Sequence, residues 1–275
     1  MGYMYKYRKL YDERTGRLDK YTLNMLLKNE IHFSKPSDFN DPYDSIMQLD
    51  TSFTEDDIYK YFKERNLNKK EDIEIMEAIK NYSIDKDKFS EEVKKTFRHR
   101  FAIFCLSNVY NNILMWSHYG DNHKGICIAL KVYDVDGKPN LLVKNKQFKS
   151  VSNESNFTYY PLFPVNYSEE RAKIFNIFTY RFGTDAPEFL LTKFKDWSYE
   201  EEFRAVLDIE DSNNKFNKQN IILEDGQIPE IMFGSKVPDK IKIKTIKLLS
   251  GKKDIIFNKM VLSDNSYKLK IYEYV

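Results

Sequence analysis

Hydrophobic and polar positions alternate at the start of the chain and then follow a helical period. Apolar or aromatic residues at every second position of 3–8 predict a short strand. Thr22 stands before apolar positions 23, 26 and 27, whose spacing predicts a helix that Thr22 caps. Residues 31–34 predict another short strand. It leads into a loop over 35–44 that is rich in Pro, Asp, Asn and Ser.

Residues 54–100 have a different character. This stretch is highly charged, lacks Gly and Pro, and carries apolar residues at helical spacing, for example at 73, 75, 76 and 79. The pattern predicts two or three amphipathic helices. Two interpretations fit equally well: an inserted cap or lid, or a helical layer that covers one side of a sheet.

The middle and the end of the chain alternate between apolar runs and polar connections. The runs at 101–107 and 126–130 predict two buried strands. Between them we expect a short helix near 112–119, and after them a loop over 131–158. Further elements are expected as follows: a strand at 164–167, a helical stretch over 169–195, a strand through 206–207, a strand at 231–233, a helix from about 240, and strands near 255 and at 269–274.

Strands and helices are therefore mixed without strict alternation. This order favours an α+β fold with a mixed, mainly antiparallel sheet over a doubly wound parallel sheet. No internal repeat and no linker divides the chain. We expect one domain over 1–275, with the helical insertion at 54–100 inside it.

Composition narrows the function classes. The chain has 275 residues and a formal net charge of +2, which excludes a strongly basic nucleic-acid-binding protein. Aromatic residues make up 15%, which is typical of packed cores and of ligand pockets alike. Two cysteines do not make a disulfide framework, and no apolar run is long enough to cross a membrane. We expect a cytoplasmic protein with no membrane partner.

Familiar catalytic fingerprints are missing from the sequence. It contains no GxGxxG, GxxxxGK[ST], HExxH or GxSxG motif. The first polar cluster is the loop around Asn40, Asp41 and Pro42. Its side chains either satisfy backbone donors of a rigid turn or face a ligand.

The second cluster spans residues 116–125 and holds His118, Tyr119 and His123 between two glycines. A five-residue spacing would place the two histidines about 140° apart on a helix, so we expect no metal site. The cluster either packs in the core through Trp116 or forms a turn that contacts a ligand.

The third cluster spans residues 197–204. On an extended strand, Glu200, Glu202 and Arg204 would share one face. Arg204 is spaced to relieve the repulsion between the two carboxylates. Such a face would either bind a hydroxyl or a ribose, or simply pair its charges in solvent.

These blocks, taken in order, resemble a widespread bacterial family of unknown function. The resemblance rests on 5–8, on Phe33 to Asp44 with its FNDP sequence, on MWSHY with HKG, on WSYE with Glu202 and Arg204, and on IMFG at 231–234. It covers residues 5 to about 235. Membership implies no established activity.

A second resemblance is to the ADP-ribosyltransferase fold. In this chain Arg8, Ser34 and the pair Glu200/Glu202 occur in the order of the Arg, hydroxyl and Glu positions of those enzymes. The resemblance implies that Arg8 holds the pyrophosphate of NAD, that Tyr119 stacks on the nicotinamide, and that Glu202 stabilises the charge as nicotinamide leaves. The chain departs from the family pattern because it lacks a clear Ser-Thr-Ser strand.

The predicted function is therefore an NAD-using transferase or NAD glycohydrolase, of a toxin-like or phage-defence type. NAD is the expected substrate, and the acceptor would be a protein or a nucleic acid. The predicted pocket is lined by Arg8, the 39–44 loop, the 118–125 turn and the 200–204 strand. The predicted catalytic residues are Glu202, Glu200, Arg8 and His118. The predicted NAD-binding residues are Arg8, Ser34, Asn40, Asp41, Tyr119, His123 and Arg204.

Two alternatives stay open at this point. The first is a nuclease or nucleotide hydrolase that uses Asp41, His118 and Glu200 as acid–base or metal groups. The second is a sensor that binds a small ligand without catalysis. The sequence leaves the oligomeric state undetermined.

Overall fold

The computed structural model of the chain describes residues 2–50, 52, 54, 56, 57, 60, 86–144, 156–176, 186–209, 219–252 and 254–274. The α-helices are α1 (Lys20–Lys28), α4 (Lys86–Arg100), α5 (Ile113–His118) and α6 (Asp239–Leu248). The 3₁₀ helices are η1 (Pro36–Asp38), η3 (Glu188–Leu190) and η4 (Lys195–Glu200). The strands are β1 (Gly2–Arg8), β2 (Glu30–His32), β3 (Phe101–Ser107), β4 (Ile126–Val135), β5 (Lys138–Lys144), β6 (Phe157–Pro161), β7 (Phe163–Pro164), β8 (Asn166–Ser168), β9 (Thr192–Phe194), β10 (Glu202–Asp208), β11 (Asn220–Ile222), β12 (Glu230–Phe233), β13 (Ile256–Leu262) and β14 (Leu269–Glu273).

The chain divides into two compact units. Unit 1 comprises residues 1–34, 102–165 and 196–275, and unit 2 comprises 35–101 and 166–195. Most of the predicted helical insertion at 54–100 lies outside the described residues. Its end, residues 86–100, forms α4 of unit 2. Among the described residues, no helix has both the length and the apolar character of a membrane span.

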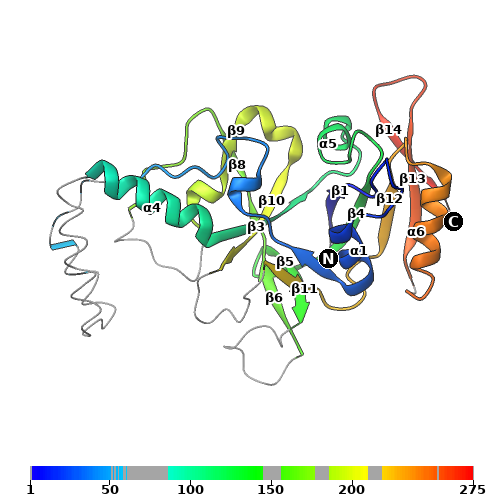
Figure 1. Ribbon diagram of the computed structural model, residues 1–275, viewed down its shortest axis with the longest axis horizontal. Coiled ribbons are helices and arrows are strands. Elements are labelled where there is room, and N and C mark those ends of the chain that lie inside the picture. Colours follow the sequence, from blue (N-terminus) through cyan, green and yellow to red (C-terminus); the bar gives the residue numbers. More distant parts are fainter. Residues whose placement is uncertain are drawn as a thin grey trace. The chain divides into compact units, whose positions relative to one another are not determined.

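Unit 1 is built on a ten-stranded sheet whose main path is β14-β13-β12-β4-β1-β3-β10-β7 (Figure 1). β5 pairs with the far end of β4, and β6 pairs with β5. β1 is antiparallel to both β3 and β4, whereas β12 and β13 are parallel. This sheet with its few helices confirms the predicted α+β fold with a mixed, mainly antiparallel sheet.

Strand alternation sends the side chains of β1 to the two faces of this sheet. Met4 joins a buried cluster that includes Leu26 of α1. Tyr7 joins a different cluster with Trp116 of α5, and the two rings meet edge to face at a centroid distance of 5.2 Å. In Figure 1, α1 and α5 lie on opposite sides of β1 and β4. We call the two faces the α1 face and the α5 face.

The expected loop over 131–158 is wrong in its first half. β4 continues to Val135 and turns back into β5 through Asp136 and Gly137, both of which have positive φ angles of 52° and 75°. Asp-Gly is the pair that a two-residue hairpin turn requires, because both central residues adopt a left-handed conformation. The Asp136-Gly137 pair was therefore the feature of the sequence that indicated the hairpin, and the hydrophobicity pattern did not include it.

Three other element boundaries differ from expectation. Helix α1 begins after Asp19, whose carboxylate accepts a hydrogen bond from the Thr22 amide at 2.8 Å, so Asp19 and not Thr22 is the cap. In the described part of 169–195 there is no α-helix, only η3, β9 and the start of η4. Glu200 ends η4, and β10 begins only at Glu202.

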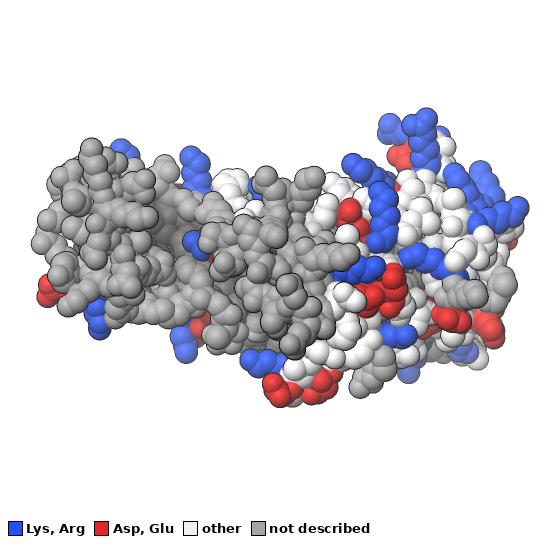
Figure 2. All heavy atoms as spheres, turned by 90° about the horizontal axis from the view of Figure 1, so that it is seen from below, with Lys and Arg blue, Asp and Glu red and all other residues white. Residues whose placement is uncertain are grey.

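Lys and Arg (blue) and Asp and Glu (red) both appear on the part of the surface that Figure 2 colours. This distribution agrees with the net charge of +2.

Candidate functional site

The candidate site lies on the α5 face of unit 1, where two of the predicted motif segments meet. Asn112 caps α5 by accepting hydrogen bonds from the amides of Leu114 and Met115 at 2.9 and 3.3 Å. Its side-chain amide also donates to the Tyr199 carbonyl at 3.2 Å. One residue therefore starts the helix and ties it to the 197–204 segment.

Two side-chain hydrogen bonds then join the segments. The Tyr119 hydroxyl donates to Oε1 of Glu200 at 2.6 Å. Nδ1 of His118 and the Tyr199 hydroxyl lie 2.8 Å apart. Adjacent residues of one segment thus contact adjacent residues of the other. We call the group formed by His118, Tyr119, Trp197, Tyr199 and Glu200 the Tyr119–Glu200 site.

The backbone at Glu200 explains why its carboxylate faces α5. Glu200 ends the 3₁₀ helix, and Glu201 takes a left-handed φ of 42° before β10 begins. The Ser107 hydroxyl donates to the Glu200 carbonyl at 2.6 Å, and the Asn108 amide donates to the Glu201 carbonyl at 3.0 Å. The end of β3 therefore fixes this bend. Glu200 retains only 2% of its exposure.

Aromatic rings surround the exposed part of the site. The ring of His118 lies 6.1 Å from that of Trp197 and 6.0 Å from that of Tyr199, both in edge-on geometry. Trp197 and Tyr199 contact each other at 6.0 Å. His118 is exposed to solvent and the other two are half-buried. Planar faces of this kind are suited to stacking on a flat ligand ring.

Glu202 and Arg204 form a buried ion pair on the same face. Nε and Nη2 of Arg204 donate to the two carboxylate oxygens of Glu202 at 2.9 and 3.0 Å. The Arg204 side chain is fully buried, and its neighbours Phe203 and Ala205 pack on the α1 face. Removing one member of such a pair costs about 3–5 kcal/mol, because the other charge is left buried alone.

Cys105 of β3 lies next to this pair. Burial raises the pKa of its thiol, and the negative charge of Glu202, to which the thiol is hydrogen-bonded, raises it further. The thiol is therefore a poor nucleophile in this state. Analysis of the sequence did not select Cys105, Asn112 or Ser107, since each becomes part of the site only through contacts far along the chain.

His123 lies in the turn that follows α5. Asp121, Asn122 and His123 have positive φ angles of 51°, 53° and 68°. Nε2 of His123 is 3.2 Å from the Ser117 hydroxyl, whereas buried Nδ1 has no hydrogen-bond partner among the described residues. Burial, helped by the charge of Lys236, lowers the pKa of His123.

Arg8 is not part of the Tyr119–Glu200 site. It follows Tyr7 in β1 and therefore points to the α1 face, where Nε donates to the Thr22 hydroxyl at 3.1 Å. Its guanidinium also lies 3.8 Å from the Asp19 carboxylate. Burial lowers the pKa of Arg8, while Asp19 acts against this shift. Arg8 thus contacts the start of α1, and Glu202 and Arg204 are on the opposite face.

The remaining predicted residues lie elsewhere. Ser34 makes an isolated bridge to Ile103, with backbone hydrogen bonds of 2.9 and 2.8 Å. Asn40 and Asp41 belong to unit 2. There, buried Asp41 accepts a hydrogen bond from the Tyr43 amide at 2.8 Å and lines a hollow of ≈ 180 Å³. In the described residues, no three His, Cys, Asp or Glu side chains are grouped to hold a metal ion.

Comparison with known proteins gives a match to a family model over part of the chain. Residues 115–205, about a third of the chain, match the model of a family described as "Protein of unknown function (DUF2971)". The matched stretch begins in α5 and ends in β10, so it contains every member of the Tyr119–Glu200 site. Over these residues the chain is similar to a family of unknown function. No curated protein and no solved structure matches the chain.

Proposed function

We propose that this chain is an enzyme that cleaves the bond between nicotinamide and ribose in NAD, as an NAD glycohydrolase or an ADP-ribosyltransferase. The observation that carries the proposal is the hydrogen bond between Tyr119 and Glu200. It fixes a carboxylate from one motif segment against an aromatic residue of the other, beside the rings of His118, Trp197 and Tyr199.

The chemistry needs a negative charge held in place. When the C1′–N bond breaks, nicotinamide leaves with the electron pair and the ribose carbon becomes positively charged. A fixed carboxylate stabilises that charge, and it does so more strongly where water is excluded. Water or another acceptor then bonds to C1′ and loses a proton. Glu200 supplies the carboxylate in this proposal.

Glu200 suits this role better than Glu202, which the sequence favoured. Both oxygens of Glu202 are hydrogen-bonded to Arg204, so its charge is already balanced. Glu202 and Arg204 would then hold the start of β10 in place. Because Glu200 is 2% exposed, the side chains that cover its carboxylate must move aside to admit the nicotinamide ribose.

The test is incubation of the protein with NAD, with chromatographic measurement of free nicotinamide. We expect Glu200→Gln to lose nicotinamide release by at least about a hundredfold, since the carboxylate loses its charge but keeps its shape. The control is Glu201→Gln, an exposed neighbour that should keep full activity. Equal rates for Glu200→Gln and the wild type would exclude Glu200 from the reaction.

The same measurement separates the other functions. A folded wild-type protein that binds NAD saturably and releases no nicotinamide would be a sensor. Release of nicotinamide with ADP-ribose found free in solution would identify a glycohydrolase. ADP-ribose found on a protein or nucleic acid would identify a transferase.

A further inference from the structure

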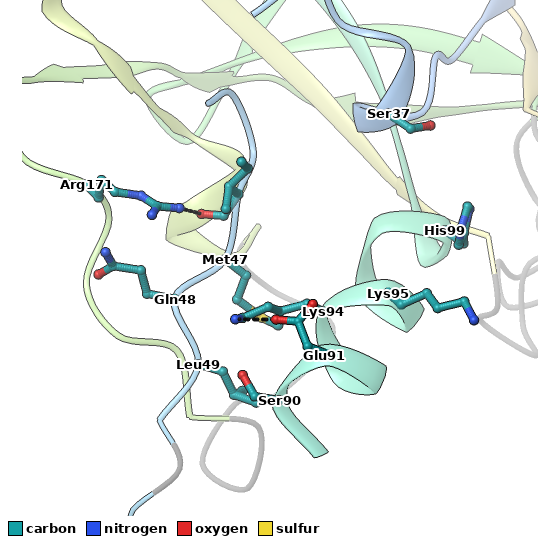
Figure 3. A pocket seen from close by; sticks show the side chains of 11 residues that line it. Ser37, Met47, Gln48, Leu49, Ser90, Glu91, Lys94, Lys95, His99 and Arg171 are labelled. Carbon is teal, nitrogen blue, oxygen red and sulfur yellow. Dashed lines mark hydrogen bonds and ion pairs between the residues drawn. The ribbon is translucent and has the colours of Figure 1, made fainter. Parts of the chain in front are cut away.

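Unit 2 contains a pocket of ≈ 540 Å³ that is separate from the Tyr119–Glu200 site (Figure 3). Every residue that lines it belongs to unit 2. One wall is α4, another is the segment 46–49, and Arg171 and Ser37 complete the lining. The volume falls within the range of about 300–1,000 Å³ that is typical of small-molecule sites.

The wall opposite α4 is held by backbone hydrogen bonds. Leu49 and Phe175 form a parallel bridge. The Phe175 amide donates to the Gln48 carbonyl at 2.6 Å, and the Asp50 amide donates to the Phe175 carbonyl at 2.8 Å. The shape of this wall therefore does not depend on side-chain packing alone.

Arg171 is attached to this wall. Its Nη2 donates to the Ile46 carbonyl at 3.3 Å, and its side chain is exposed. Figure 3 shows that Arg171 reaches toward the pocket from the side opposite α4. A guanidinium has five N–H donors, so one bond to a carbonyl leaves most of them available to a ligand.

The α4 wall presents a stripe of charged residues. Glu91, Lys95 and His99 are spaced by four, and Lys94 follows Glu91 by three, so all lie on one side of the helix. Lys94 and Glu91 form an ion pair at 3.0 Å, and in Figure 3 both project toward Met47. Among the described residues, Lys95 and His99 have no hydrogen-bond or ion-pair partner.

We propose that this pocket binds a phosphate ester of nucleotide size. Among the residues that line it in the described part of the chain, three permanent cations (Lys94, Lys95 and Arg171) stand against one carboxylate, Glu91. Lys94 and Arg171 come from opposite walls, and in this proposal both bond to an oxyanion of the ligand after Lys94 exchanges Glu91 for it. Charge-assisted hydrogen bonds of this kind are about twice as strong as neutral ones.

The apolar part of the lining limits the ligand further. Ile46, Met47 and Leu49 stand beside the charged groups. A free phosphate ion would leave these side chains without a partner. A ligand that carries a base or another flat group on its phosphate would cover them, and burial of apolar area would add to the binding.

The experiment is calorimetric titration of the full-length protein with ADP, pyrophosphate and adenosine at low salt. We expect ADP to bind best, pyrophosphate more weakly, and adenosine not measurably. In the double variant Lys94→Gln/Arg171→Gln, ADP should bind about tenfold more weakly or worse. The control, Lys240→Gln/Lys247→Gln on α6, removes the same charge from exposed positions of unit 1 and should bind as the wild type does.

A variant that binds ADP more tightly than the wild type must be folded, so it provides a second test that misfolding cannot imitate. Glu91→Gln removes the carboxylate that stands among the described lining residues and should tighten ADP binding severalfold. No saturable binding of ADP or pyrophosphate by the wild type, or equal binding by the double variant, would overturn the proposal.

The experiment also separates this pocket from the NAD site. Binding of ADP that Glu200→Gln retains and Lys94→Gln/Arg171→Gln loses belongs to the pocket in unit 2. Binding lost only in Glu200→Gln overturns the pocket and leaves the proposed function intact. Nicotinamide release should be unchanged in the double variant, whichever result is obtained.

Discussion

At the scale of single residues, the amine of Lys6 in β1 lies in surroundings that disfavour its positive charge. Its ammonium donates a hydrogen bond to the Cys105 carbonyl at 2.8 Å and lies 4.6 Å from the centre of the Phe104 ring. The pKa of Lys6 is lowered from 10.5 to about 8, mainly by burial and to a smaller extent by the charge of Arg8, while Cys105 and Glu202 act in the opposite direction. Folding thus disfavours the protonated amine.

The sign of this effect predicts a pH dependence. Between pH 8 and 10.5 the unfolded chain keeps a proton on Lys6 that the folded chain releases, so the stability of the protein should rise with pH in that window. Below pH 8 both states are protonated and the penalty is complete. Lys6→Met should therefore be more stable than the wild type at about pH 7, and this advantage should shrink by about pH 10.

Urea denaturation of both proteins at the two pH values checks this prediction. Lys9→Met is the matched control, because Lys9 is exposed and lies in the same part of the chain. Its free energy of unfolding should differ from that of the wild type by the same amount at both pH values. If the stability difference between Lys6→Met and the wild type is also the same at both pH values, burial of the Lys6 amine does not affect the free energy of unfolding.

Single residues also show how much of the candidate site could be predicted from the sequence. His118, Tyr119 and Glu200 were selected from composition and order, and the structure brings them together. Arg8 was selected in the same way but points to the other face. The alternation of side chains along a strand predicts that Tyr7 and Arg8 point to opposite faces of the sheet. It does not say which of the two shares a face with Glu202, since that depends on packing across three strands.

At the scale of elements, two glycines hold the turn after α5 close to its neighbours. A Cβ on Gly125 would lie 2.2 Å from the Arg8 carbonyl oxygen, and one on Gly234 would lie 2.2 Å from the His123 carbonyl oxygen. The Gly234 amide donates to the Gly125 carbonyl at 3.0 Å. These contacts join the ends of β1, β4 and β12 to the turn that carries His123.

Gly234→Ala should therefore destabilise the protein by about 3 kcal/mol or more, because the atom that it meets is backbone and cannot rotate away. Thermal unfolding of the variant measures the loss. Gly251→Ala is the control, since nothing lies within 4 Å of its Cβ position and its φ is not in the left-handed range. A Gly234→Ala protein as stable as the control would mean that this turn moves freely away from β12.

Elements with an uninterrupted pattern were predicted well, and those defined by turns were not. The apolar run 101–107 is β3 with the predicted bounds, and 126–130 is the start of β4. The hairpin of β4 and β5 was missed because Lys138, Pro139 and Asn140 interrupt the apolar pattern just after the turn. Glu200 was assigned to a strand because nothing in the sequence marks the left-handed bend at Glu201.

At the scale of the whole molecule, the two units differ in their chromophores. The chain has two tryptophans, Trp116 and Trp197, and both belong to unit 1. Tryptophan fluorescence therefore reports on unit 1 alone, whereas far-ultraviolet circular dichroism also records α4 of unit 2. We expect the urea transitions measured by the two methods not to coincide, because each unit has its own set of contacts.

A variant confined to unit 2 sharpens this prediction. The carboxylate of Asp44 and the amine of Lys193 form a buried ion pair at 3.5 Å. Asp44→Asn should lower the urea midpoint measured by circular dichroism and leave the fluorescence midpoint in place. Equal shifts in both signals would show instead that the chain unfolds as one cooperative body.

The fold class was predictable because it depends on the order in which helices and strands follow one another along the chain. The division into units was not, since unit 2 combines two segments, 35–101 and 166–195, that are distant in the sequence. The charged stretch 54–100 ends at the boundary near 101, but no comparable change in composition marks the boundaries at 34, 165 and 195. The contacts that define it, such as Leu49 with Phe175, depend on tertiary packing.

The central position of β1 has a consequence for the synthesis of the chain. β1 precedes the other strands of its sheet in the sequence, yet its neighbours in the sheet are β3 and β4, and Tyr5 pairs with Ser107 and Ala129. About a hundred residues must be translated before its backbone groups find their partners. During that time β1 presents two unpaired edges with alternating aromatic side chains, which is a surface that other chains can join. The pairing positions of β1 therefore stay open to other chains until β3 and β4 have been made.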